Sequence, residues 1–435
     1  MKILLAVPYQ DVEPYILPNL GLGYLASALR KYGHDVNYVD CLKERIYSSE
    51  WESLLQRGSY DVVGIQMFSY TFNSVREMMH IAKKTLPDVV TVVGGPHINA
   101  IPKNTLQYNQ EIDYGIHGEG ERAFPELVNF LQSNHNEDKK SSIPNLVWRN
   151  KNNEVQVNNK AFIDSLDDIE MPAWDLMDPR TYPHLSHGLL NRAYPIAPMF
   201  STRGCPFNCT FCSAHPNMGA RIRKRIPSKV VDEIEYLVKE YGVKEIHFED
   251  DNFTFYKEFV SEVCQLIIDR GICISWACPN GVRLDSLDAE LLKLMEKSGC
   301  YSFAVGIESG SDRVLKLMKK GTTADKIRQK IRLIAETTKI RMTGFIIIGF
   351  PGETEDDLKK TEELVLEEPL HRVAAGSFIP LPATKAYDDL VKEGKLPERY
   401  DWNKLSQTFS GEDDVFTSGS LTQKKISDSI RRIHL

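Results

Sequence analysis

The sequence predicts an α/β protein in which a doubly wound parallel sheet is followed by a partial barrel of six strand–helix units. Short runs of aliphatic residues alternate with amphipathic helical patterns along both halves of the chain, which is typical of parallel sheets. A polar stretch with several prolines separates the two halves. With 435 residues, 42% of them hydrophobic, the chain is long enough for about two to three domains with sizeable cores.

These patterns divide the chain into four parts. We expect the sheet domain at 1–135, a hairpin and linker at 136–195, the barrel at 196–395 and a short C-terminal segment at 396–435. The linker is placed where the composition becomes polar and where prolines interrupt any regular element.

The strands of the first domain are short runs of aliphatic residues, and its helices repeat apolar residues every three or four positions. Strands are expected at 2–8, 36–40, 61–67, 89–95 and 113–117, helices at 21–30, 75–84 and 123–132, and a hairpin at 145–157. Ligands of such sheets bind beyond the carboxyl ends of the strands. There the segments 69–74, 94–100 and 118–121 carry glycine and polar residues, although sharp strand-to-helix turns explain each segment equally well when it is taken singly.

The second half repeats the same alternation. Strands are expected at 196–202, 243–249, 273–278, 301–308, 341–349 and 374–379, and helices at 228–241, 257–270, 289–297 and 323–338. A polar segment at 405–420 and a short amphipathic helix at 421–433 follow. Polar residues at the carboxyl ends of barrel strands are candidates for catalysis or binding.

Three cysteines stand in one short loop after the first barrel strand. Cys205, Cys209 and Cys212 form a C-x3-C-x2-C run, and three thiolates so spaced can hold three irons of a 4Fe–4S cluster. The fourth iron then stays open for a substrate or cofactor. A zinc site would need a further ligand pair, which does not follow, and a disulfide framework suits smaller, secreted domains.

The remaining composition narrows the class further. The other cysteines (Cys41, Cys264, Cys273, Cys278 and Cys300) are scattered and are expected to be buried and inert. The net charge of −7 gives no global case for nucleic acid, and the basic run 221–225 is expected to be a solvated loop, with a phosphate or carboxylate contact as the alternative. The first apolar run is too short for a signal peptide, and no apolar stretch of about 20 residues is present, so we expect a cytoplasmic protein without a membrane span.

The cysteine loop, with Phe211 directly before its last cysteine, resembles the radical S-adenosylmethionine (SAM) superfamily. In that superfamily the open iron binds SAM, and one electron from the cluster cleaves it to a 5′-deoxyadenosyl radical. The resemblance implies SAM contacts at the ends of the barrel strands: Phe211, Glu249, Asp250, Asn280, Arg283, Glu308 and Ser309. It also places the adenine near 349–354. Helix capping is the alternative role for the acidic run 249–252 and for Glu353.

Residues 1–130, with Pro18-Asn-Leu-Gly-Leu-Gly-Tyr-Leu-Ala and the three strand-end segments, resemble the Rossmann-like cobalamin-binding domain of a large radical SAM subfamily. The resemblance implies cobalamin contacts at Ser69, Tyr70, Thr71, Gly94, Gly95, His97, Gly118, Glu119 and Gly120. One departure concerns the motif Asp-x-His-x-x-Gly, whose histidine ligates cobalt in many cobalamin domains. Here Asp40-Cys41-Leu42 has no histidine at that place. Members of the subfamily that bind cobalamin often lack this histidine too, but a chain that had lost cobalamin binding would lack it as well.

The combined resemblance is to cobalamin-binding, class B radical SAM methyltransferases. It implies methylation of an unactivated carbon, or of phosphorus, in a small or medium metabolite through a 5′-deoxyadenosyl radical and methylcobalamin. Cyclisation, rearrangement, coupling or transfer of another SAM-derived group on the same architecture stays open, as does a sensor without turnover. The expected partners are a small-molecule or short peptide substrate and an electron donor such as flavodoxin or ferredoxin, with no nucleic acid.

Overall fold

A computed structural model describes residues 1–10, 16–133, 137–185, 191–397, 402, 416–417 and 419–434. Its described residues form two compact units. One comprises Met1–Leu185 with Pro216–Met218 and the described part of Asp401–Leu405, and the other comprises the rest of the chain.

The first unit is built on a mainly parallel sheet with the strand order β2-β1-β3-β4-β5-β6-β7. The strands β1 to β5 are parallel to their neighbours, and β6 and β7 are antiparallel additions. In chain order the strands are β1 (Lys2–Val7), β2 (Asp35–Asp40), β3 (Val62–Gln66), β4 (Val90–Gly94), β5 (Tyr114–Ile116), β6 (Leu146–Arg149) and β7 (Val155–Val157). Because β1 lies between β2 and β3, the chain order reverses there, which is where ligands of doubly wound sheets bind.

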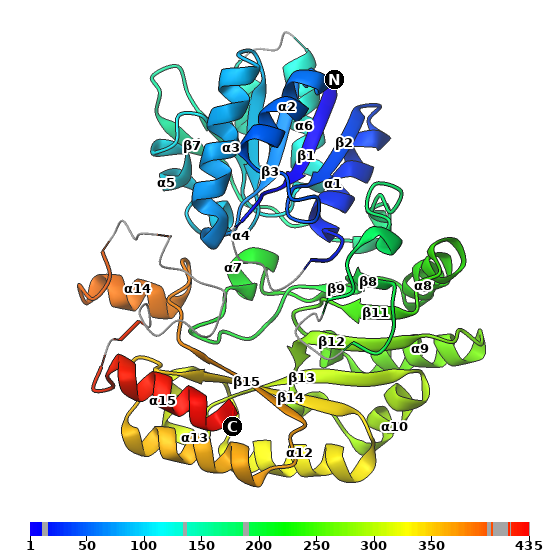
Figure 1. Ribbon diagram of the computed structural model, residues 1–435, viewed down its shortest axis with the longest axis vertical. Coiled ribbons are helices and arrows are strands. Elements are labelled where there is room, and N and C mark those ends of the chain that lie inside the picture. Colours follow the sequence, from blue (N-terminus) through cyan, green and yellow to red (C-terminus); the bar gives the residue numbers. More distant parts are fainter. Residues whose placement is uncertain are drawn as a thin grey trace. The chain divides into compact units, whose positions relative to one another are not determined.

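Helices cover both faces of this sheet, as Figure 1 shows. The helices are α1 (Leu20–Lys31), α2 (Ser48–Gly58), α3 (Phe72–Thr85), α4 (Pro96–Ala100), α5 (Pro102–Gln107) and α6 (Gly120–Gln132). One hydrophobic core joins α1 and α6 to one face, and a second core joins α2 and α3 to the other. Leu29 and Phe124 are central to the first core, and Trp51 and Met78 to the second. The fold is therefore doubly wound, as predicted.

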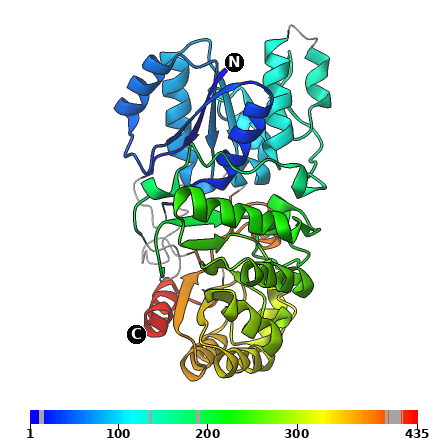
Figure 2. The same ribbon diagram turned by 90° about the vertical axis from the view of Figure 1, so that its right-hand side faces the viewer.

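The second unit contains a six-stranded parallel sheet with the order β15-β14-β13-β12-β11-β8. Its strands are β8 (Ile196–Met199), β11 (Glu245–Phe248), β12 (Ser275–Val282), β13 (Cys300–Glu308), β14 (Arg341–Ile348) and β15 (Arg372–Ser377). The connecting helices are α8 (Pro227–Tyr241), α9 (Lys257–Asp269), α10 (Ala289–Lys297), α11 (Asp312–Leu317), α12 (Ala324–Thr337) and α13 (Glu355–Glu367). Figure 2 shows most of them in green to orange along one side of this unit. β8 and β15 do not pair with each other in the described sheet, so it is an open, partial barrel.

The C-terminal part of the second unit covers the edge of this sheet. After α14 (Lys385–Lys392), α15 (Gln423–His434) packs against β15 and α13. The backbone N–H of Ala375 donates to His434 Nε2 at 3.2 Å, and Glu362 accepts from Arg432 and Ser429. The amphipathic helix expected at 421–433 is confirmed, whereas most of 405–420 lies outside the described residues.

The basic run after the cysteines was expected to be a solvated loop, with a phosphate or carboxylate contact as the alternative. Arg221 and Lys224 are exposed, whereas Arg225 makes a carboxylate contact. Arg223–Lys224 forms β10, which pairs antiparallel with β9 (Thr202–Arg203). Arg225 donates to Glu233 at 2.6 Å, and that carboxylate is fully buried. The run therefore holds the two ends of the cysteine segment together by pairing with β9. Among the described residues no helix has the length and apolar character needed to cross a bilayer.

Candidate cofactor sites

The cysteine loop begins at the carboxyl end of β8 and is closed by backbone hydrogen bonds. Cys205 N donates to Gly219 O at 3.1 Å, so the loop returns to its starting point. Gly204 has a φ of +98°, and a Cβ there would lie 2.4 Å from Arg221 O. Only glycine fits this approach. The turn that presents Cys205 is thus dictated by backbone geometry.

Three contacts from other elements hold the loop in place. Thr210 N donates to Met318 O at 2.9 Å, and the Thr210 hydroxyl donates to Leu317 O at 3.3 Å, both at the end of α11. Thr210 O accepts from Ala386 N at the start of α14. The loop is therefore fixed between two helix ends.

Arg283 adds a ring contact to this anchoring. Its guanidinium stacks on Phe207 at 3.7 Å from the ring centroid, and it donates to Lys320 O at 3.0 Å and to Asp285 at 2.9 Å. A planar guanidinium holds such a stack and its hydrogen bonds at once. Arg283, predicted as a SAM contact, is thus brought directly to the cysteine loop.

The three loop thiols are free and half-buried, and the fit to a cluster rests on this donor set. Burial raises the pKa of Cys205, and it raises that of Cys212 to about 12, with Cys209 adding to the shift. In the described residues no three His, Cys, Asp or Glu side chains are arranged as ligands of one metal ion. Of the other cysteines, Cys273 is exposed, contrary to expectation, and the rest are buried.

The acidic run follows β11, the strand beside β8. Asp250 is fully occupied by the strand that feeds the cysteine loop, because it accepts from Ser201 Oγ at 2.8 Å and from Thr202 N. Its carboxylate is 1% exposed, and burial raises its pKa. Asp251 accepts from the N–H of Gly204, and burial of its carboxyl group, followed by the Asp250 charge, raises its pKa to about 6. The acidic run therefore fixes the turn before the cysteines through its hydrogen bonds, and it also places carboxyl groups at this strand end.

Glu249 differs from its neighbours. Burial, followed by the Asp250 charge, raises the pKa of Glu249 to about 8. Asn280, predicted as a SAM contact, lies beside it and donates to Glu249 O at 2.9 Å. Asn252 is 1% exposed, and neither polar atom of its amide has a partner in the described structure. A cationic amino group would satisfy buried acceptors of this kind.

The end of β13 carries an ion pair that the sequence did not predict. Lys320 donates to Glu308 at 2.7 Å, and both side chains are largely buried. A Cβ at Gly306 would lie 2.5 Å from the Lys320 Nζ, so this glycine makes room for the pair. Glu308 has a φ of +65°, an unusual conformation for a glutamate that the surrounding contacts must hold.

The side chains of Ser309 and Glu353 make hydrogen bonds to other residues of the chain. Ser309 is fully buried and shares a hydrogen bond of 3.1 Å with Thr361 of α13, so its hydroxyl faces the helix layer. Glu353 accepts from Gly349 N at 2.6 Å, and burial raises its pKa to about 7. Thr354, not Glu353, caps α13.

In the first unit, hydrogen bonds join the segments that follow β3 and β4. Ser69 Oγ and His97 Nδ1 are 2.9 Å apart. His97 is fully buried, and burial lowers its pKa to about 3, so its ring is neutral. Its Nε2 has no partner in the described structure. Tyr70 stacks on Phe68, and Thr71 caps the turn by accepting from Phe68 N.

The predicted glycine positions fall into two groups. Gly94 is open, with no atom closer than 3.9 Å to a Cβ built there, and Gly95 has a φ of +107°. The segment after β5 is covered instead: Asn145 Nδ2 would lie 3.2 Å from a Cβ at Gly118, Glu119 accepts from Ile163 N at 2.5 Å, and Gly120 packs on Leu25. The open backbone of this edge is therefore at Gly94, the last residue of β4.

The position of the missing cobalt ligand follows β2. Asp40 is 2% exposed and accepts from Lys43 N at 3.0 Å. Tyr182 hydrogen-bonds to Asp40 and lies 3.2 Å from Tyr38 through the two hydroxyl groups. Leu42 stands at the histidine position and offers no metal ligand.

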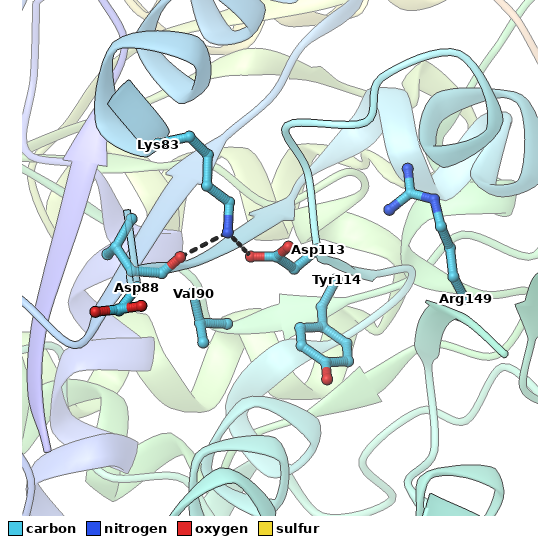
Figure 3. A pocket seen from close by; sticks show the side chains of 7 residues that line it. Lys83, Asp88, Val90, Asp113, Tyr114 and Arg149 are labelled. Carbon is cyan, nitrogen blue, oxygen red and sulfur yellow. Dashed lines mark hydrogen bonds and ion pairs between the residues drawn. The ribbon is translucent and has the colours of Figure 1, made fainter. Parts of the chain in front are cut away.

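A cavity lies at the other end of β4 and β5. It has a volume of about 380 Å³ and is lined by Lys83, Asp88, Val89, Val90, Asp113, Tyr114 and Arg149. Lys83 donates to Asp113 at 2.5 Å (Figure 3), and it also donates to the carbonyl of Val89 at 2.7 Å. Arg149 donates to three backbone carbonyls. Since these cations are engaged within the protein and lie at the amino ends of the strands, we assign this cavity no cofactor.

A cysteine loop at the end of the first strand of an open six-stranded barrel defines the radical SAM class. The Radical SAM superfamily model matches residues 199–365, and the B12 binding domain model matches residues 8–128. An uncharacterized methyltransferase of Pyrococcus horikoshii is 30% identical over 100% of this chain and 92% of its own length. The chain belongs to the radical SAM enzymes that carry a B12-binding domain, whose cofactors are a 4Fe–4S cluster, SAM and cobalamin.

Other relatives share most of the chain. The cytidylyl-2-hydroxyethylphosphonate methyltransferase of Streptomyces wedmorensis is 28% identical over 90% of this chain and 82% of its own. The anaerobic magnesium-protoporphyrin IX monomethyl ester cyclase of Cereibacter sphaeroides is 26% identical over 89% and 62%, respectively. The structure of the radical SAM methyltransferase TsrM from Kitasatospora setae matches with a TM-score of 0.74 at 19% identity, over 92% of this chain and 77% of TsrM, and supports the fold.

Proposed function

We propose that this protein methylates an unactivated carbon, or a phosphorus atom, of a small or medium metabolite. The observation that carries the proposal is that one chain contains both cofactor modules, each with polar residues and glycines at its strand ends, and matches a relative named as a methyltransferase over its whole length. The phosphonate methyltransferase, whose name indicates a small nucleotide-linked substrate, supports the substrate class.

The cofactors supply the reactive chemistry when bound, namely one-electron cleavage of SAM and carriage of a methyl group. The chain supplies ligands and position. Cys205, Cys209 and Cys212 are the cluster ligands, and Thr210 and Arg283 hold their loop. Geometry of this kind lowers the barrier by orienting the reacting groups.

We assign SAM recognition to the neighbouring strand ends. Glu249 offers a carboxylate to the cationic amino group, with Asn280 beside it. Glu308, held by Lys320, offers hydrogen-bond acceptors from β13. Asp250 acts through the loop, since its carboxylate is occupied by Ser201 and Thr202.

In the first unit, Ser69, Gly94, Gly95 and His97 are the cobalamin contacts that the geometry favours. Gly94 leaves its backbone open, and the buried Nε2 of His97 needs a partner. Gly118, Glu119 and Gly120 shape this edge from beneath, because their contacts are with other parts of the chain. Tyr70 and Thr71 form the turn that carries Ser69.

The test uses anaerobic protein reconstituted with iron, sulfide and cobalamin, given SAM and a strong one-electron reductant. Methyl transfer predicts both S-adenosylhomocysteine and 5′-deoxyadenosine, the former only with cobalamin present. 5′-Deoxyadenosine alone would favour the second candidate, ring formation, which the cyclase relative supports. If neither product forms, both enzymatic candidates are refuted and the protein is a sensor.

A flavodoxin or ferredoxin is the electron donor that we expect to replace the chemical reductant.

A further inference from the structure

The inference concerns two side-chain amides at the point where the first sheet reverses its strand order. Asn19 follows β1 and opens α1, and Gln66 ends β3. Asn19 Nδ2 donates to Gln66 Oε1 at 2.5 Å, although 47 residues separate them. Since α1 and α3 leave toward opposite faces of the sheet, this amide pair spans the crevice between them.

Both polar atoms of the Asn19 amide are committed to the fold, whereas only one atom of the Gln66 amide is. Asn19 Oδ1 accepts from Leu22 N at 3.0 Å and so caps α1, while its Nδ2 is used by Gln66. Gln66 accepts through Oε1, and its half-buried Nε2 makes no hydrogen bond among the described residues. A hydrogen-bond donor is therefore presented at the crevice on a side chain whose orientation is fixed.

The backbone around Gln66 lacks side chains. Gly21 is exposed, and a Cβ there would lie 3.5 Å from both Asn19 Oδ1 and Gln66 Nε2. Gly95 contacts Gln66 from the other side, where a Cβ would lie 3.2 Å from Gln66 Cγ, and Gly94 is open. Glycine on both sides of an amide allows the close approach of a large, flat ligand.

His97 provides a second, independent indication of a ligand at this edge. It is fully buried in α4, directly after β4, and its backbone N–H donates to the carbonyl of Met67, the residue after Gln66. Its Nε2 has no partner in the described structure. Buried polar atoms left without partners are rare and call for an explanation. A bound ligand with its own amide groups would provide one.

We propose that the Asn19–Gln66 pair is a binding subsite for the carboxamide side chains on the corrin ring of cobalamin. Carboxamides both donate and accept, so they match a neutral amide pair better than a charged group would. This assignment rests on the proposed function, because it requires that the protein bind cobalamin. It adds two residues that the sequence did not indicate as cobalamin contacts, although Asn19 lies in the motif that begins at Pro18.

The test measures dissociation constants of cobalamin and of cobinamide, which lacks the nucleotide tail, by anaerobic absorbance titration of the full chain. Gln66→Leu removes the amide at similar size and should weaken both ligands about fivefold, the loss of about one neutral hydrogen bond. Asn19→Asp keeps the helix cap but cannot donate to Gln66, and it should weaken both as well. Gln56→Leu, an exposed amide on α2, is the matched control and should change neither constant.

The outcomes separate this inference from the proposed function. If the wild-type chain binds no corrinoid, the proposed function fails. If it binds cobalamin but Gln66→Leu and Asn19→Asp leave both constants unchanged, only the subsite fails. If the variants weaken cobalamin and spare cobinamide, the pair contacts the nucleotide tail, and the assignment to carboxamides is overturned. Circular dichroism of each variant checks that the fold is retained.

Discussion

The cysteine loop could be predicted from individual residues because the residues that define it are close together in the sequence. Cys205, Cys209 and Cys212 lie within one short stretch, and their spacing alone indicates a cluster. The residues that hold the loop could not be found this way. Thr210 bonds to Leu317 across 107 positions, and Lys320 meets Arg283 across 37. Such pairs arise from folding and leave no pattern in the chain.

Changing Cys205, Cys209 or Cys212 to Ala should abolish the cluster and all reductive SAM cleavage, since each thiolate holds one iron. Iron content, electron paramagnetic resonance of the reduced protein and 5′-deoxyadenosine formation measure this. Cys273→Ala removes an exposed thiol outside the loop and serves as the control, with wild-type iron content expected. Full cluster and cleavage in any one of the three loop variants would disprove the ligand assignment.

Substitutions of Glu249 and of Asp250 should have different effects on iron content and on SAM binding. Asp250→Asn should lower iron loading, because Asp250 holds Ser201 and Thr202 before the loop. Glu249→Gln should keep near-normal iron and weaken SAM binding about tenfold, the loss of one charge-assisted contact. Iron analysis and SAM titration measure both. Equal SAM affinity in wild type and Glu249→Gln would return Glu249 to a purely structural role.

Glu249 also predicts a pH dependence of stability. Burial raises its pKa to about 8, whereas in the unfolded chain it titrates near 4.5. The folded chain therefore binds this proton more tightly, and the free energy of unfolding of the cofactor-free protein should fall as pH rises from about 5 to 8. Urea titrations across that range should show a smaller fall for Glu249→Gln, with Asp251 and Glu353 still contributing. Equal slopes would mean that Glu249 is ionised in the folded chain.

At the scale of elements, strands and helices with strong periodicity were predicted well. α10 was expected at 289–297 and is Ala289–Lys297. α2 was missed because only Trp51 and Leu55 are buried on it, which gives too weak an apolar pattern. The hairpin β6–β7 was expected, but its pairing with β5 was not, since which sheet edge a hairpin joins depends on distant residues.

The turn after β14 provides a prediction at this scale. Gly349 has a φ of +81°, and a Cβ there would lie 2.7 Å from Ile426 of α15. Gly349→Ala should cost about 1–3 kcal/mol beyond backbone strain alone, because the Ile426 side chain must shift to make room. Gly394 has a similar φ of +68°, and a Cβ there would have no atom within 4 Å. Gly394→Ala therefore measures the backbone strain alone and serves as the control. Chemical unfolding compares the two, and equal losses would show that α15 does not press on this turn.

For the whole molecule, the absence of a histidine at Leu42 predicts the state of bound cobalt. Asp40 is already engaged by Tyr182, and no side chain at 40–42 carries a nitrogen that could coordinate cobalt in place of histidine. Cobalamin should therefore bind with its benzimidazole base displaced and no protein nitrogen on cobalt, its tail near Ser69 and Gly94. Electron paramagnetic resonance of the cob(II) form should show no nitrogen superhyperfine splitting. A splitting from a lower nitrogen would contradict this arrangement.

The placement of α15 along β15 has a consequence for biosynthesis. In the described sheet β15 is an edge strand that pairs with β14 on one side only, and the helix that shields its other side is translated later. During synthesis the nascent barrel thus exposes a strand that another chain could pair with, and aggregation at that stage is a characteristic hazard of parallel sheets. A chain stopped before Gln423 should accumulate in inclusion bodies, and supplying α15 as a separate peptide during refolding should increase the soluble yield.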